Sequence, residues 1–214
     1  MTFEVGTFDV QRFDSILSRG LSCGLGSAGQ QVCIEAAICE SLGLPHGDDP
    51  GCVSPAVRAF KIALNDSSWS SATARANGLR DLGLAQLGSL GVVDDVEFAV
   101  RLSKKTISIL LPKLFRAVMP NDKEALEAAD RCEKEDSKES AKYAESAAKY
   151  AAKSAKYAEY AAKSAAKSAK YAEYAAEYAA KYAESAADEY LTLTAKLALD
   201  TLRELNSPGC ALLG

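Results

Sequence analysis

Three cysteines and the only histidine of the chain stand close together in the sequence and are the first residues that could bind a metal. They follow the spacing C-x5-C-x6-H-x5-C, which comprises Cys33, Cys39, His46 and Cys52. Thiolate and imidazole groups suit zinc, but structural zinc sites usually hold cysteines in C-x2-4-C pairs. Such pairs are absent from this sequence, and free cysteine is common in protein cores. We therefore interpret these residues as packed thiols and a loop histidine, and expect no metal and no cofactor.

Two other patterns could support chemistry. Cys33, His46 and Asp48 offer a thiol, a base and a carboxylate, the residue types of a nucleophilic site, but no nucleophile motif surrounds Cys33. The glycine-rich stretch 24–29 resembles a phosphate-binding loop, but it lacks the Gly-Lys-Ser/Thr ending that such loops require. We therefore expect no catalytic residues and interpret the protein as a non-enzyme.

Two polar loops, residues 46–50 and 65–71, are dense in hydrogen-bonding groups. Asp and Ser in such loops mostly serve turns and helix caps, and this is the favoured interpretation. The second interpretation is a pocket for a small polar ligand, in which Trp69 supplies a stacking surface. The residues that would form this pocket are His46, Asp48, Asp49, Arg58, Asp66, Trp69 and Arg75.

Composition limits the remaining classes of function. The net charge is −4 and the pI about 5.2, and neither half of the chain has an excess of basic residues, so general nucleic-acid binding is not supported. No apolar run is long enough to cross a membrane, and the first residues lack the apolar segment of a signal peptide. We expect a cytoplasmic protein with reduced cysteines, because disulfides are rare in that compartment.

Glycine and proline divide the chain into two kinds of sequence. Of the 14 glycines, all but Gly209 and Gly214 precede Val92, and no proline lies between Pro120 and Pro208. Apolar spacing and capping residues predict a compact all-α domain over residues 1–120. Its predicted helices span residues 9–18, 30–42 and 54–64, a fourth runs from Ser70 or Ser71 to Gly88 or Gly91, and a fifth from Asp94 or Asp95 to Val118 with a kink at Pro112.

Residues 121–206 predict one very long, coiled-coil-like helix with a break near residue 136, followed by a C-terminal tail over residues 207–214. From residue 141 onward, alanine occupies every a and d position of seven heptads. Such a repeat favours left-handed supercoiling against a partner helix, and alanine lets two backbones approach closely. This alanine seam comprises Ala141, Ala144, Ala148, Ala151, Ala155, Ala158, Ala162, Ala165, Ala169, Ala172, Ala176, Ala179, Ala183 and Ala186.

Two further features of the C-terminal part indicate packing. A stripe of tyrosines follows one side of the heptads and is too large to leave exposed on a soluble monomer. It would pack on a neighbouring subunit or on the N-terminal domain. Beyond the heptads, leucines from Leu191 to Leu205 predict a hydrophobic docking end that stops at Pro208-Gly209.

Several short segments resemble a family of uncharacterised bacterial and bacteriophage proteins that join a similar block to an Ala/Tyr-rich C-terminal tail. The resemblance covers residues 30–95 and the character of the tail, and rests on Cys33-Ile-Glu-Ala-Ala, Gly43-Leu-Pro-His-Gly-Asp-Asp-Pro, Cys52-Val-Ser-Pro-Ala-Val-Arg58, Leu64-Asn-Asp-Ser and Ala85-Gln-Leu-Gly-Ser89. No activity is established for that family, so the resemblance implies a bacteriophage or mobile-element setting and no functional residue.

The sequence thus leads to two functional hypotheses. The first is a non-enzymatic homo-oligomer that self-associates into a bundle or filament through the alanine seam. The alternative is a bacteriophage-type protein that binds and sequesters a small polar ligand through the N-terminal polar loops. The uniform alanine seam favours the first hypothesis, and the Asp- and Arg-containing loops favour the second.

Overall fold

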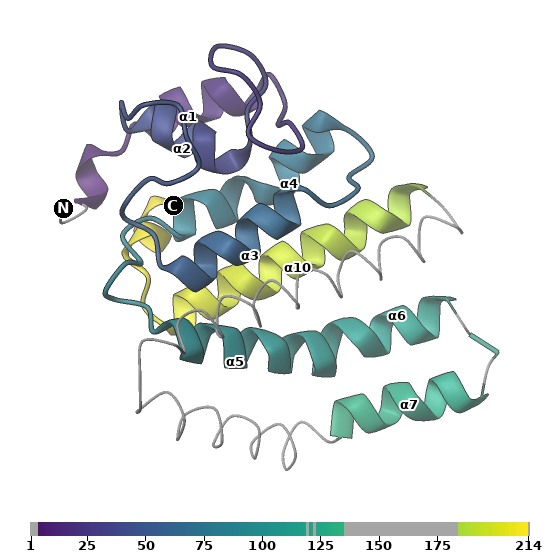
Figure 1. Ribbon diagram of the computed structural model, residues 1–214. Coiled ribbons are helices and arrows are strands. Elements are labelled where there is room, and N and C mark those ends of the chain that lie inside the picture. Colours follow the sequence, from purple (N-terminus) through teal and green to yellow (C-terminus); the bar gives the residue numbers. More distant parts are fainter. Residues whose placement is uncertain (1–3, 119, 122, 135–183, 214) are drawn as a thin grey trace.

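The computed structural model describes residues 4–118, 120–121, 123–134 and 184–213, and these residues form an all-α fold (Figure 1). Two isolated β-bridges, Leu21 with Val32 and Gly26 with Val32, are the extended pairings within the described part of the chain. The α-helices are α1 (Val10–Leu17), α2 (Ile34–Ser41), α3 (Pro55–Asn65), α4 (Ala72–Ala85), α5 (Asp95–Lys105), α6 (Leu111–Val118), α7 (Lys123–Lys134) and α10 (Glu184–Glu204). The shorter turns are η1 (Val5–Thr7), η2 (Thr106–Leu110) and η4 (Pro208–Leu213).

Capping side chains begin several of these helices where the sequence predicts. The Ser54 hydroxyl accepts a hydrogen bond from the Val57 amide, and Pro55 occupies the first turn of α3. Ser71 and Asp94 cap α4 and α5 in the same way, because a side-chain oxygen satisfies an amide that has no partner within the helix. These three predicted helix starts are confirmed.

The predicted helix over residues 30–42 begins later, at Ile34. Gln31 and Val32 are used by the preceding loop, since their carbonyl oxygens accept hydrogen bonds from the amides of Ser27 and Ser22. The Cys33 sulfur then caps α2 by accepting from the Ala36 amide at 3.4 Å. The sequence prediction was wrong about this start because apolar periodicity alone does not reveal loop pairing.

Pro112 changes the pitch of its helix without ending it. Residues 95–118 run continuously through α5, η2 and α6, and η2 is a π-helical turn in which the Leu111 amide donates to the Thr106 carbonyl. Proline has no N–H to donate to the turn before it, and a π turn widens the helix at that point. Figure 1 shows α5 and α6 following each other along one edge of the molecule.

The hydrophobic core lies between α2, α3, α4, α5 and α10. Phe13, Phe60, Phe98 and Leu79 are completely buried there, together with Leu191 and Leu202 of α10. These residues belong to one continuous cluster, and Figure 1 shows α10 running between the α3–α4 layer and α5. The predicted docking of the leucine-rich end is therefore confirmed.

The turn η4 completes the packing of this C-terminal segment against α4. The Gly209 amide donates to the Leu87 carbonyl at 2.8 Å, and a Cβ at Gly209 would lie 2.1 Å from the Leu84 carbonyl oxygen. The Ser207 hydroxyl donates to the Ala85 carbonyl at 2.5 Å. The described residues after the heptads, through residue 213, therefore pack on the domain.

The predicted very long helix falls mostly outside the described residues. Seam positions 141–183 lie there, while Ala186 stands in the first turn of α10. The domain division and the break near residue 136 stay predictions. Among the described helices, none is long and apolar enough to cross a lipid bilayer.

Candidate functional site

Asp48 and Asp49, two of the predicted ligand residues, form ion pairs with Arg58, which is a third. Arg58 of α3 donates to the Asp48 carboxylate at 2.7 Å and to the Asp48 carbonyl at 2.6 Å, and its guanidinium lies 3.8 Å from Asp49. Asp49 also accepts the Gly51 amide at 3.0 Å. This arrangement closes the loop before α3, and His46 lies exposed in the same loop. These contacts are the turn chemistry that the favoured interpretation predicts.

Arg75 is buried and fastens the loops around α4. Its guanidinium donates to the carbonyls of Leu21 and Asn65, both at 2.8 Å, and to that of Ser67 at 3.5 Å. Three of the five N–H donors of this guanidinium are thus committed to backbone carbonyls within the protein. Arg75 is therefore a structural residue of this fold.

Trp69 is a core residue, which corrects the expectation of a stacking surface. Its side chain is 7% exposed, and the indole N–H donates to the Leu64 carbonyl at 2.9 Å. The ring lies against the backbone of Gly78, where an added Cβ would stand 2.4 Å from the indole Cη2. The polar surroundings of Trp69 in the sequence therefore do not reflect its position in the fold.

Asp48 and Asp66 are brought together at the rim of a small pocket. The Asp66 carboxylate accepts the Gly24 amide at 2.7 Å and the Asn65 side-chain amide at 2.8 Å. The pocket has a volume of about 70 Å³, and Glu35 and Cys33 of the α2 start also line it. Pockets for drug-sized ligands usually have about 300–1,000 Å³, so this one accommodates only a very small molecule.

The sequence reasoning missed a buried polar cluster formed by Glu35, Lys61 and Gln86. These residues come from α2, from α3 and from the end of α4, and each has an exposure of 0%. Lys61 Nζ lies 3.0 Å from Glu35 Oε1, and the Gln86 amide donates to Glu35 Oε2 at 2.9 Å. Buried charges of this kind are rare unless paired.

Hydrogen bonding within this cluster is incomplete. Despite the short ion-pair distance, neither Glu35 Oε1 nor Lys61 Nζ makes a hydrogen bond of favourable geometry with another described atom, and the same holds for Gln86 Oε1. Burial raises the pKa of Glu35, while Lys61 and Gln86 lower it to a smaller extent. Burial likewise lowers the pKa of Lys61 against the opposing effect of Glu35.

A signal for this cluster was available in the sequence. Glu35 stands between Ile34 and Ala36 in the apolar first turns of its helix, and Lys61 stands between Phe60 and Ile62 in a second helix. A charged residue on the apolar face of a helix indicates a buried partner. The sequence could not show that Glu35 and Lys61 pair with each other, because their pairing depends on how α2 packs against α3.

The cysteines that suggested zinc lie beside this cluster as buried thiols. Cys33, Cys39 and Cys52 are buried, and burial is the main cause that raises the pKa of each. A raised pKa favours the thiol over the thiolate that binds metals and attacks electrophiles. No set of three or more His, Cys, Asp or Glu residues in the described part of the chain has a geometry that could hold a metal ion.

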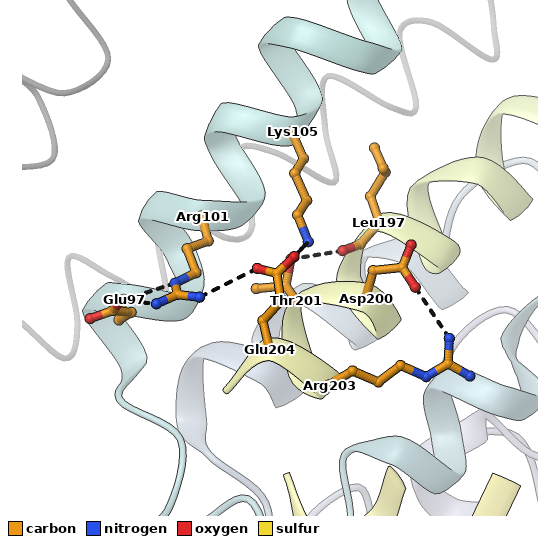
Figure 2. A network of polar contacts seen from close by, with 8 residues as sticks. All are labelled: Glu97, Arg101, Lys105, Leu197, Asp200, Thr201, Arg203 and Glu204. Carbon is orange, nitrogen blue, oxygen red and sulfur yellow. Dashed lines mark hydrogen bonds and ion pairs between the residues drawn. The ribbon is translucent and has the colours of Figure 1, made fainter. Parts of the chain in front are cut away.

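A polar network fastens α10 to α5 on another side of the domain. Figure 2 shows Glu204 of α10 accepting from Lys105 at 2.7 Å and from Arg101 at 3.4 Å. Arg101 also pairs with Glu97 one turn earlier on α5. These pairs hold the end of α10 in register with α5 and contain no open site.

A groove of about 450 Å³ lies between α6 and α10. Charged and apolar side chains line it together, namely Lys113, Arg116, Ala117, Glu189, Tyr190 and Leu193. Arg116 is held by Asp130 at 2.8 Å and by Glu133 at 2.5 Å, both on α7, and the Tyr190 hydroxyl donates to the Lys113 carbonyl at 3.3 Å. None of the residues predicted to bind a ligand lines this groove.

Comparison of the chain with protein-family models, with curated proteins and with solved structures found no match.

Proposed function

We propose that this protein is a non-enzymatic homo-oligomer that self-associates through the alanine seam of its heptad region. The observation that carries the proposal is alanine at fourteen consecutive a and d positions, from Ala141 to Ala186. A sequence that only needed to be helical would not restrict these positions to the smallest helix-forming side chain. Close backbone approach requires such a restriction.

The way in which the heptad region joins the domain supports this proposal. On the N-terminal side, Arg116 of α6 holds α7 through Asp130 and Glu133. On the C-terminal side, α10 is part of the hydrophobic core, with Leu191 and Leu202 completely buried. The described helices that precede and follow the heptad region in the chain, α7 and α10, thus both pack on the domain, which supports a role for the region between them in joining two copies.

A set of matched variants tests the proposal. Replacing Ala155, Ala162 and Ala169 with Glu introduces charge at three a positions, and we expect the oligomer to dissociate while helicity persists. The control carries the same number of Ala-to-Glu changes at e positions Ala152, Ala166 and Ala180. Glutamate already occupies this e position in neighbouring heptads, at Glu145, Glu159 and Glu173. The control should therefore remain assembled.

Light scattering after size-exclusion chromatography gives the subunit number of each protein, and circular dichroism gives its helicity. A wild-type protein that is monomeric at tens of micromolar would refute the proposal. The same conclusion would follow if the a-position and e-position variants assembled equally well.

The alternative function, capture of a small polar ligand in a bacteriophage setting, has one observation in its favour. Asp48 and Asp66, two of the seven predicted residues, line the same pocket. The volume of that pocket and the internal contacts of Arg58, Trp69 and Arg75 make this function the less supported one. Native mass spectrometry of protein from its own host would reveal a retained ligand and the subunit number together.

A further inference from the structure

The core of the domain contains an acid, an amine and an amide that come together from three different helices. Glu35, Lys61 and Gln86 are each 0% exposed, so water does not solvate the charges that Glu35 and Lys61 carry in solution. Removing two charges from water is unfavourable by several kcal/mol for each ion, and their mutual attraction offsets this only when the remaining hydrogen-bonding groups are satisfied. Those groups are not satisfied here, because Lys61 Nζ and Gln86 Oε1 lack hydrogen-bond partners among the described residues.

The same three side chains can form a second arrangement that carries no charge. We propose that Glu35 and Lys61 share one proton, so that the core holds a neutral carboxylic acid and a neutral amine in exchange with the ion pair. Lys61 Nζ and Glu35 Oε1 lie 3.0 Å apart, close enough for a proton to pass once a small rotation of the side chains directs an N–H at Oε1. The N–H bond at Nζ breaks, the electron pair remains on nitrogen, and an O–H bond forms at Oε1.

Gln86 has a hydrogen bond to offer in either arrangement. Its amide nitrogen now donates to Glu35 Oε2 at 2.9 Å, which suits a carboxylate. Oε2 accepts this hydrogen bond whether the proton is on Lys61 Nζ or on Glu35 Oε1, because the transfer leaves Oε2 unprotonated. The Gln86 hydrogen bond is therefore compatible with both arrangements.

Burial favours the uncharged arrangement over the ion pair. The ordinary pKa values are 4.5 for Glu35 and 10.5 for Lys61, a gap of 6 that must be closed before the proton prefers the acid. Burial moves the two pKa values toward each other, since it raises that of Glu35 and lowers that of Lys61. The attraction within the ion pair opposes this displacement.

The other titratable groups near Glu35 and Lys61 neither give up nor take up the proton that the pair shares. Cys33 and Cys39 raise the pKa of Lys61, and Arg58 lowers the pKa of Glu35. The thiols remain protonated because burial raises their pKa, and arginine does not lose its proton in proteins. Proton transfer within the pair changes no net charge, so pH near neutrality does not drive it.

Nuclear magnetic resonance of the full chain tests the proposal, with carbon-13 in the glutamate carboxyls and nitrogen-15 in the lysine amines. Lys105 and Glu204 provide a matched control, since they form a pair at 2.7 Å whose side chains are 18% and 46% exposed. At neutral pH we expect the Glu35 carboxyl signal to be displaced toward the carboxylic-acid position and the Lys61 signal toward the neutral-amine position. The control pair should show a carboxylate and an ammonium.

Three results would overturn the proposal. Glu35 and Lys61 signals that match those of Glu204 and Lys105 would show a fixed ion pair. A protonated Glu35 beside an ammonium at Lys61 would show uptake of a proton from solvent without transfer. In a Lys61→Arg variant that folds, Glu35 should return to the carboxylate position because guanidinium keeps its proton, and a Glu35 signal that stays displaced would also contradict sharing.

Discussion

Lys61 Nζ lies 3.0 Å from Glu35 Oε1, and neither side chain reaches solvent. Replacing a buried ion pair with well-packed uncharged residues is often neutral or stabilises a protein by about 1–4 kcal/mol. We expect the double variant Glu35→Gln/Lys61→Met to have a free energy of unfolding at least equal to that of the wild type. Glutamine preserves an acceptor for the Gln86 amide, and methionine fills the volume of the lysine stem.

Urea unfolding followed by the fluorescence of the single tryptophan, Trp69, measures this difference. A Leu64→Met variant is the control for repacking in the same core, and volume-conserving changes of this kind usually cost less than about 1.5 kcal/mol. A double variant clearly less stable than this control would show that the charges themselves stabilise the domain.

The close contact between Trp69 and Gly78 gives a second prediction. A Cβ at Gly78 would lie 2.4 Å from the indole Cη2 and 2.5 Å from Cζ3, so Gly78→Ala must displace the ring. Overpacking of this kind typically costs about 1–3 kcal/mol, which outweighs the gain of roughly 1 kcal/mol in helix propensity. We expect a lower urea midpoint and an altered Trp69 emission spectrum.

Gly83 in the same helix is the matched control for this prediction. A Cβ there would stand 3.0 Å from Phe13 Cζ and 3.1 Å from Ile34 Cδ1, both of which are ends of side chains that can adjust. Gly83→Ala should therefore destabilise the protein less than Gly78→Ala. The reverse order would show that the indole is not held against α4.

The network in Figure 2 predicts a dependence on pH. The hydrogen bond from Lys105 is the largest effect on Glu204 and lowers its pKa. A lowered pKa in the folded state means that the stabilisation is present above the ordinary value of 4.5 and is lost as the pH falls below it. At pH 7 the free energy of unfolding of Glu204→Gln should be lower than that of the wild type by roughly 0.2–1 kcal/mol, because exposed ion pairs contribute little to stability.

Urea unfolding at neutral and at acidic pH tests this dependence, since the wild type and Glu204→Gln should converge in acid. Asp200→Asn is the control, because Asp200 pairs with Arg203 within α10 and does not reach α5. If the effect of Glu204→Gln persists in acid, it arises from packing and not from charge.

The cysteines should differ sharply in reactivity. Burial raises the pKa of Cys39 to about 11 and also raises that of Cys33, whereas Cys23 is exposed. Since the thiolate is the reactive form, iodoacetamide at mildly alkaline pH should label Cys23 first and the buried pair only after unfolding. Peptide mass spectrometry in the presence and absence of urea measures this order, and rapid labelling of Cys33 in the folded protein would contradict the burial.

Local features of this fold could be predicted from the sequence, whereas contacts between distant segments could not. Ser54-Pro55 and Asp94 mark helix starts because capping is a short-range interaction. Trp69 was misjudged because its neighbours are polar, although the indole folds back onto the Leu64 carbonyl. The pairing of Glu35 with Lys61 joins two helices, and periodicity within each helix carries no information about it.

The candidate ligand residues show the same limit. Their types were suited to binding, but whether a polar group is free depends on the backbone atoms nearby. Arg75 is engaged by carbonyls from residues as distant as Leu21, and Arg58 by the loop that contains Asp48. The seam alanines are the opposite case, because a sequence repeat identifies them and only an assembly experiment can assign their partner.

The return of α10 into the core also has an evolutionary consequence. Because α7 is fastened to α6 and α10 to α4 and α5, the heptads are an insertion between two anchored helices. Slippage of the gene by whole 21-nucleotide units would change the number of heptads while the codons for the core remain in frame. Lineages that carry this domain should therefore vary in the number of heptads much more than in the residues of α4 and α10.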